Sequence, residues 1–270
     1  MDEIKELRES IDLIDGQMLV LLNERARLAQ QIGLIKKRSG RPVYAPERAE
    51  QLMRRLAAQS RGPLDEQAIR AIYREIMSAS LALEKDTVIA TEGTVAGLTH
   101  LAAIQQFGSS VRYTFHNEPS DLFEAVGSGA ADCGVIPFEE EGPGAAILEL
   151  LSEGKVFLCS QIVLGAKSGA GLSRYLVLGR EPNTPSGDDQ TALLIHLNDQ
   201  PGTLAAALDP FRISGVNVLS IHSRRSLGGG LHLLLDVEGH SNDPSLQGAI
   251  EVLKSSGMNP IVCGSYPRFR

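Results

Sequence analysis

The sequence is poor in cysteine and has no long uninterrupted apolar run. Its three cysteines, Cys133, Cys159 and Cys263, are odd in number and lack the spacing of metal ligands. This pattern predicts a protein of a reducing compartment without a cysteine metal site. The first residues lack the apolar core of a signal peptide, and no apolar stretch is long enough to span a bilayer. We therefore expect a cytoplasmic protein without a membrane partner.

An excess of positive charge is also absent. The chain has 26 Lys and Arg against 33 Asp and Glu, a net charge of −7, which argues against a nucleic-acid partner. Local groups of basic residues are therefore expected to bind small anions. The content of 43% hydrophobic and 22% charged residues is that of an ordinary globular protein. A length of 270 residues suggests two or three domains.

Residues 2–38 are predicted to form one long amphipathic helix. Apolar side chains recur every three or four residues, which is the spacing of a single helical stripe. The stripe consists of Ile4, Leu7, Ile11, Ile14, Met18, Leu21, Leu28, Ile32 and Ile35. Gly16 and Gly33 each cost about 1 kcal/mol relative to alanine without ending the helix. The helix is roughly 55 Å long, so two short helices of the same chain cover only part of it. A second copy of the protein is the expected cover.

Three cations on this helix, Arg8, Arg25 and Lys36, are candidate anion ligands. Arg25 occupies a stripe position, where a buried guanidinium without an anion is costly. Arg25 and Lys36 are 11 residues apart and point the same way. Arg8 lies on another face, roughly 26 Å along the axis from Arg25. Either Arg8 and Lys36 are solvated surface charges, as most such residues are, or all three serve one pocket and Arg8 comes from the partner chain.

Two shorter helices are predicted to follow. One opens at Ala45 and Pro46, with proline in its first turn, and runs to about residue 60. The other covers residues 64–85 after the Arg-Gly-Pro break at 61–63. Ser80 and Glu84 are four residues apart on one face of this third helix. Glu84 is either an exposed charge at a helix end or part of a site.

This first domain resembles the all-helical chorismate mutase module that opens the bifunctional chorismate mutase/prephenate dehydratase proteins. The matching stretches are ELR at 6–8, LNER at 22–25, IKK at 35–37, RPVYAPER at 41–48 and EIMSAS at 75–80. The resemblance implies an intertwined dimer in which the first arginine crosses to the other protomer. The residues it implies for substrate binding are Arg8, Arg25, Arg48 and Ser80, and those for catalysis are Lys36 and Glu84.

The implied reaction converts chorismate to prephenate by a concerted rearrangement, without a nucleophile, metal or organic cofactor. The protein then positions the substrate and stabilises charge, and Lys36 and Glu84 would hydrogen-bond the ether oxygen. Two positions depart from the family pattern. Where the family often has Asp and Glu around the second-helix arginine, this chain has Ala45 and Ala49. The missing Glu is the residue that usually contacts the substrate hydroxyl.

From residue 87 onward, short β runs alternate with helices, which predicts a small α/β layer. The predicted strands are residues 87–90, 111–115, 132–137, 156–164 and 174–178, and the predicted helices are 98–107, 120–128 and 145–152.

This middle segment is similar to part of a prephenate dehydratase. EGT at 92–94 matches the family's opening GPEGT, SRY at 173–175 matches its TRF, and ADCGVIP at 131–137 matches the strand before its PIENS motif. That motif is PFEEE at 137–141 here, so carboxylates stand where a dianionic substrate should bind, and like charges repel. Only residues 165–171 join QIVL to LSRY, where the family inserts a second lobe. Because a cleft enzyme needs two walls, we predict a remnant without dehydratase activity.

Residues 181–188 are a predicted linker, and the remaining pattern is βαββαβ, a ferredoxin-like arrangement. Its predicted elements are strands 191–197, 216–224, 231–237 and 260–264, and helices 203–214 and 244–256. With NDQPGTL at 198–204 and GVNV at 215–218, it resembles the amino-acid-binding ACT domain that ends these proteins. The family's ESRP is HSRR at 222–225 here. The implied effector is phenylalanine, and the implied effector site consists of Asn198, Gly202, Leu204, Asn217 and Val218.

We therefore predict a multidomain protein with an all-α three-helix domain at 1–86, an α/β remnant lobe at 87–180 and a ferredoxin-like α+β ACT domain at 189–270. The predicted function is that of a cytoplasmic chorismate mutase, at least homodimeric, which phenylalanine regulates and which has lost the dehydratase activity. One alternative keeps both activities. Another is a non-catalytic amino-acid sensor or partner subunit, in which Ala45 and Ala49 mark a dead mutase.

Overall fold

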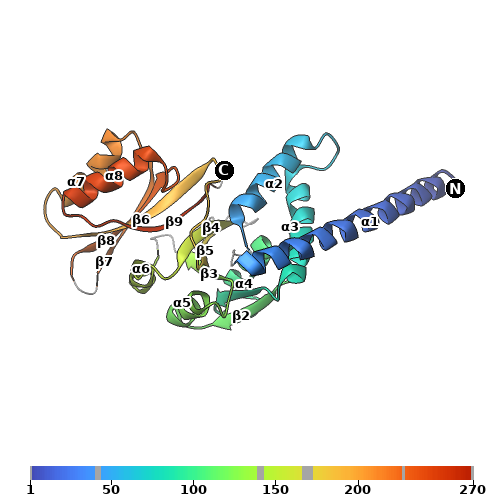
Figure 1. The fold of residues 1–270 in the computed structure, drawn as a ribbon, viewed down its shortest axis with the longest axis horizontal. Coiled ribbons are helices and arrows are strands. Elements are labelled where there is room, and N and C mark those ends of the chain that lie inside the picture. The colour runs from blue at the N-terminus through green and yellow to red at the C-terminus, as the bar shows by residue number, and fades with distance from the viewer. Residues whose placement is uncertain (1, 40–43, 139–142, 166–172, 227–228, 269–270) are drawn as a thin grey trace.

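The computed structural model describes residues 2–39, 44–138, 143–165, 173–226 and 229–268. A group of helices lies at one end of the molecule, a sheet with two helices lies at the other, and an α/β lobe lies between them (Figure 1). The predicted turn at 40–43, the carboxylates Glu139 to Glu141 and most of the connection after residue 165 lie outside the described residues. In the described part of the chain, no helix has the length and apolar character needed to cross a membrane.

The three predicted N-terminal helices are present as α1 (Asp2–Ser39), α2 (Pro46–Gln59) and α3 (Glu66–Glu84). Helix α2 begins with its proline, as predicted. Helix α3 begins two residues later than predicted, because extended Asp65 is its N-cap and accepts a 2.7 Å hydrogen bond from the backbone N–H of Ala68. Helix α1 packs on α3, and α3 packs on α2.

The apolar stripe of α1 stays uncovered in the single chain. Ile4 is 62% exposed and Leu21 is 64% exposed, whereas Ala29 and Gly33 are buried where α1 meets α3. The N-terminal half of α1 projects away from the rest of the molecule (Figure 1). The helices of the same chain therefore cover only the C-terminal part of α1, as its length predicted.

The α/β lobe contains a mixed five-stranded sheet in the order β2-β1-β3-β5-β4. Strand β1 is parallel to β2 and β3, whereas β5 is antiparallel to both β3 and β4. Its elements are β1 (Val88–Glu92), α4 (Leu98–Phe107), β2 (Arg112–His116), α5 (Pro119–Ser128), β3 (Cys133–Phe138), α6 (Ala145–Ser152), β4 (Phe157–Leu164) and β5 (Ser173–Gly179). The predicted α/β layer is thus confirmed.

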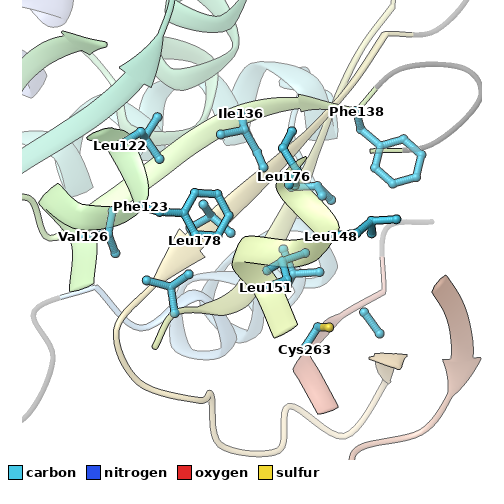
Figure 2. Packing of buried hydrophobic residues seen from close by; sticks show 14 of the residues in the cluster. Leu122, Phe123, Val126, Ile136, Phe138, Leu148, Leu151, Leu176, Leu178 and Cys263 are labelled. Atoms are coloured by element: carbon cyan, nitrogen blue, oxygen red, sulfur yellow. The ribbon is translucent and has the colours of Figure 1, made fainter. Parts of the chain in front are cut away.

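The C-terminal part has the predicted βαββαβ order, with an antiparallel sheet in the order β7-β8-β6-β9. Its elements are β6 (Asp189–Leu197), α7 (Thr203–Ile213), β7 (Val218–Arg225), β8 (Leu231–Glu238), α8 (Pro244–Ser255) and β9 (Ile261–Pro267). One face of this sheet packs on Phe211 of α7 and Leu253 of α8. The other face joins the core of the lobe, where Cys263 of β9 belongs to the same cluster as Leu148 and Leu151 of α6 (Figure 2).

The predicted end of the last strand at residue 264 is wrong, because β9 continues to Pro267. Gly264 does not end the strand. It lies where β9 crosses β4, and a Cβ added there would be 2.1 Å from the carbonyl oxygen of Leu158. Its φ of +154° also favours glycine. The glycine therefore permits a close approach between the two sheets.

Candidate active site

The ion pair between Lys36 and Glu84 lies where α1 crosses α3. The Nζ atom of Lys36 donates to Oε2 of Glu84 at 3.2 Å, and the Glu84 side chain is only 10% exposed. Gly33 makes this crossing possible, since a Cβ added to it would lie 2.9 Å from the Cα of Glu84. Glu84 is therefore not the exposed helix-end charge that its sequence position allowed.

A second contact between the two helices joins Arg25 to Ser80. Nη1 of Arg25 donates to the hydroxyl oxygen of Ser80, and that hydroxyl donates to the carbonyl oxygen of Ile76 at 2.8 Å. Ser80 is buried, and Arg25 is half-buried rather than solvated. The guanidinium thus has donors left for an anion, because it carries five N–H groups.

Both pairs line one cavity of about 1140 Å³. Arg48 on the first turn of α2 also lines it, so Arg25, Lys36 and Arg48 share the cavity with the Glu84 carboxyl. The cavity is also lined by Arg54, Arg70, Arg74 and Arg268. Ala45 and Ala49 lie in the same wall. Arg8 does not belong to the lining; it is exposed on the projecting half of α1. The structure therefore brings together all the predicted mutase residues except Arg8.

Sequence reasoning missed the cavity residues that come from outside the three helices. Helix α4 contributes Gln105, Gln106 and Phe107, strand β4 contributes residues 160–163, and Arg268 comes from the C-terminal end. Within the helices, Glu50 lines the cavity but is paired with Arg70 at 3.2 Å. No sequence pattern points to these contacts, because they join segments that are far apart in the chain.

Comparisons with known proteins match this arrangement. The chain matches the family models for chorismate mutase type II over residues 7–85 and for the ACT domain over residues 191–254. A bifunctional chorismate mutase/prephenate dehydratase of Aquifex aeolicus is 29% identical over 99% of this chain and 99% of the relative. Over its whole length the chain is thus similar to bifunctional chorismate mutase/prephenate dehydratases.

Two solved structures match the part of the molecule beyond the helices. A prephenate dehydratase from Streptococcus mutans is 26% identical with a TM-score of 0.58, over 68% of this chain and all of that chain. GqqA, described as a novel type of quorum quenching acylase, is 26% identical with a TM-score of 0.59, over 67% of this chain and 95% of that chain. The α/β lobe therefore has a prephenate dehydratase-like fold.

The chain lacks positions that the Aquifex relative has. The alignment with the Aquifex relative runs over 357 positions, whereas this chain has 270 residues. At least 87 positions, the difference between 357 and 270, therefore have no residue in this chain. In the structure β4 and β5 pair as antiparallel neighbours, with Leu164 opposite Ser173. In the sequence, only residues 165–172 join these two strands.

The dehydratase-like motifs meet at one edge of the lobe's sheet. Strands β1 and β3 are parallel, so Glu92 and Phe138 end at the same edge. Strand β5 begins there, because Arg174 lies opposite Phe138 in the antiparallel ladder. The EGT and SRY segments and the start of PFEEE are therefore neighbours. The three dehydratase-like segments therefore lie together at this edge, although the connection between β4 and β5 is short.

The predicted effector residues fall into two groups that do not meet within one chain. Strands β6 and β7 are both antiparallel to β8, so they run parallel to each other. Asn198, Gly202 and Leu204 follow the end of β6, whereas Asn217 and Val218 lie at the start of β7. Helix α7, with 11 residues, separates the two groups by roughly 16 Å. One small ligand can contact both groups only if they come from two chains.

His222 stands where the family's ACT motif has glutamate, and it faces the lobe. Its ring packs edge-on against Phe138, with centroids 4.8 Å apart, and its buried Nε2 atom has no hydrogen-bond partner among the residues that the structure describes. Burial lowers the pKa of His222; Asp236 opposes this effect, and Arg174 and Arg224 add to it. A neutral imidazole, rather than a carboxylate, thus lies between the ACT sheet and the lobe.

Proposed function

We propose that this protein is a chorismate mutase whose dehydratase unit is no longer active and whose ACT domain binds an aromatic amino acid, phenylalanine first among them. The functional units are the segments 1–86, 87–180 and 189–270. One observation carries the proposal: the Arg25–Ser80 and Lys36–Glu84 pairs line a common cavity with Arg48. This is a site for a small molecule that carries two carboxylates and a polar reacting atom.

The substrate's carboxylates are assigned to Arg25 and Arg48, and to Arg8 of a second copy. Arginine suits this task because its guanidinium binds carboxylates through two parallel hydrogen bonds. Lys36 and Glu84 face the ether oxygen, on which negative charge develops as the C–O bond breaks and a C–C bond forms. A rate enhancement of about a million-fold needs roughly 8 kcal/mol. Several charge-assisted hydrogen bonds in a site shielded from water supply energies of this size.

The assignment includes a homodimer through α1. The exposed stripe of α1 needs a cover, and Arg8 lies too far along the helix from Arg25 to reach the same ligand. A second α1 laid along the first would answer both needs, because it buries the stripe and brings its own Arg8 to the cavity. The assembly is therefore proposed to be a symmetric pair with two shared sites.

Purified full-length protein supplied with chorismate tests the proposal. Accumulation of prephenate is the expected result. Phenylpyruvate formed above the nonenzymatic acid rate, and abolished by Ser173→Ala, would instead support the bifunctional alternative, which the shared edge of the EGT and SRY segments favours. Chorismate that is left unchanged would favour the non-catalytic sensor, in which Ala45 and Ala49 mark a lost mutase site.

Glu84→Gln tests the role of Glu84 in the mutase reaction. An ionised carboxylate only accepts hydrogen bonds, whereas an amide N–H is a permanent donor. In Glu84→Gln the amide oxygen still accepts from Lys36 while the amide N–H can donate to the ether oxygen. If Glu84 acts as the donor, we therefore expect kcat/KM of this variant to be at least that of the wild type.

The control for this experiment is Glu24→Gln, which removes an exposed carboxylate next to Arg25. Its kcat/KM should equal that of the wild type. A loss of kcat/KM in Glu84→Gln but not in Glu24→Gln would show that Glu84 is not the donor.

Phenylalanine is expected to stabilise the protein by binding between two ACT domains. The 198–204 turn of one copy and residues 217–218 of the other form the proposed site, since α7 separates the two groups within one chain. A ligand at a hundredfold excess over its Kd adds about 2.7 kcal/mol of stability, so the melting temperature should rise by several degrees. Leu204→Ala removes an exposed side chain and should abolish the rise while the fold is kept.

If calorimetry shows neither heat of binding nor a melting shift at millimolar phenylalanine, the effector proposal is wrong. His222→Glu is then the first substitution to test.

A further inference from the structure

The α/β lobe forms part of the wall of the mutase cavity. Gln105, Gln106 and Phe107 of α4 and residues 160–163 of β4 line it opposite the three N-terminal helices. The lobe also contacts α3, which carries Ser80 and Glu84, and Tyr44, which directly precedes the first turn of α2 that carries Arg48.

The contact with α3 is made by the turn after α4. The Oε2 atom of Glu75 accepts hydrogen bonds from the backbone N–H of Ser109 at 3.1 Å and from its hydroxyl at 2.9 Å. The backbone N–H of Ser110 donates to the Ser78 hydroxyl at 3.0 Å. Gly108 allows this approach, since its φ is +73° and a Cβ added to it would lie 2.5 Å from the Cβ of Ser78. The hydrogen bond from the Ser109 backbone is the largest cause that lowers the pKa of Glu75. The α3 helix that carries Ser80 and Glu84 is thus docked on the lobe.

Tyr44 connects the start of α2 to the same lobe. Its hydroxyl oxygen accepts a 2.7 Å hydrogen bond from Nε2 of Gln106. Its ring packs on Phe107, with centroids 4.8 Å apart and a 57° tilt. Burial raises the pKa of Tyr44, so the hydroxyl keeps its proton throughout the working pH range. Tyr44, which is partly buried, therefore packs against the core of the lobe.

The first turn of α2 has no side-chain cap, so the packing of Tyr44 is one of the contacts that fix this turn. Ala45 is the N-cap residue, and its methyl group cannot accept a hydrogen bond from the exposed backbone N–H groups of the turn. Tyr44 is the residue before the N-cap, and its hydrogen bond to Gln106 fixes the chain there. The Thr184 hydroxyl donates to Oε1 of Glu47, within the turn, at 3.0 Å. Arg48 comes directly after these anchors and lines the cavity.

We propose that the lobe has become a structural part of the mutase site and that Gln106, acting through Tyr44, is a positioning residue for Arg48. The inference rests on the proposed function, which assigns Arg48 to a substrate carboxylate. With the first turn of α2 fixed, Arg48 is held ready for the substrate and the cost of ordering it on binding is lower. The lobe would then support the mutase reaction although its own dehydratase activity is lost.

The test uses full-length Tyr44→Phe and Gln106→Leu, each of which removes one partner of the hydrogen bond and keeps the bulk of the side chain. Arg48 holds the substrate in the ground state and in the transition state alike, so KM for chorismate should rise about fivefold while kcat changes by less than about twofold. The KM of the double variant should not exceed the higher KM of the two single variants, because both substitutions break the same contact. In an Arg48→Lys background, Tyr44→Phe should add less than about twofold.

Tyr175→Phe is the matched control. Tyr175 lies in the same core cluster as Phe107, within the lobe, and burial raises the pKa of its hydroxyl. The substitution removes the same group from the same core without touching α2, so KM should stay at the wild-type value. Hydrogen exchange gives a readout that needs no activity. The Ala49 amide, bonded to the Ala45 carbonyl at 3.1 Å, should exchange faster in Tyr44→Phe and not in Tyr175→Phe.

Several outcomes would overturn the inference. They are a wild-type KM together with wild-type exchange in Tyr44→Phe, an equal rise of KM in Tyr175→Phe, or effects of Tyr44→Phe and Arg48→Lys that simply multiply. If the wild type leaves chorismate unchanged, the proposed function fails, and exchange at Ala49 still decides whether the lobe anchors α2.

Discussion

Arg25→Ala is expected to lower kcat/KM for chorismate by about 100- to 1000-fold, the largest loss from a single substitution in this protein. The guanidinium is assigned to a substrate carboxylate, and each hydrogen bond to a charged group contributes about 1.5–3 kcal/mol. Two such bonds account for a loss of this size. The variant should still fold, because Ser80 keeps its 2.8 Å hydrogen bond to the Ile76 carbonyl.

Arg27→Ala is the matched control for this prediction. Arg27 lies on the same helix two residues away but is exposed, so its removal should leave kcat/KM within about twofold of the wild type. The measurement is the initial rate of chorismate loss, with melting temperatures recorded for both variants. A loss below tenfold in Arg25→Ala, with an unchanged melting temperature, would remove Arg25 from the proposed carboxylate site.

Mixing two inactive proteins, Arg8→Ala and Arg25→Ala, is expected to restore activity. If Arg8 crosses between chains, a mixed dimer contains one site with both defects and one intact site. After random exchange of equal amounts, half of the dimers are mixed, so about a quarter of all sites are intact. The expected result is therefore a rise from near zero to about a quarter of the wild-type rate.

Subunit exchange has to be confirmed in the same sample, for example by mass spectrometry of differently tagged chains. Mixed protein that stays as inactive as its two components, with exchange complete, contradicts the crossing of Arg8. Active Arg8→Ala protein would mean that Arg8 is a solvated surface charge, which is the ordinary state of an arginine on an exposed helix.

The order of the elements could be predicted from the sequence because their periodicities are strong. Helix 98–107 and helix 145–152 have the predicted bounds in α4 and α6. The boundaries differ from the predicted ones where a single residue determines them. Asp65 starts α3 by capping it, and Gly264 interrupts the side-chain pattern of β9 without ending the strand. Such features depend on three-dimensional neighbours, which a periodicity does not contain.

The candidate site was predictable in its residue types more than in its surroundings. Helical spacing placed Arg25 and Lys36 on one side of α1, and the structure turns both toward α3. Gly33 had been expected only to cost helix stability, whereas it makes room for Glu84. The contact of Tyr44 with Gln106 spans 62 residues, and neither local propensity nor spacing indicates it. Contacts of this kind follow from how the parts of the chain pack together.

The exposed stripe of α1 has a consequence for how the protein is made. α1 leaves the ribosome before α3, and Glu84, at the end of α3, follows 45 residues after Ser39, the end of α1. At about 5–20 residues per second this interval lasts roughly 2–9 s. During that time the apolar stripe has no partner within its own chain, and the finished chain still leaves its first half bare. Neighbouring ribosomes on one message hold identical nascent helices at high local concentration, so we expect pairing to begin during translation and to favour copies read from the same message.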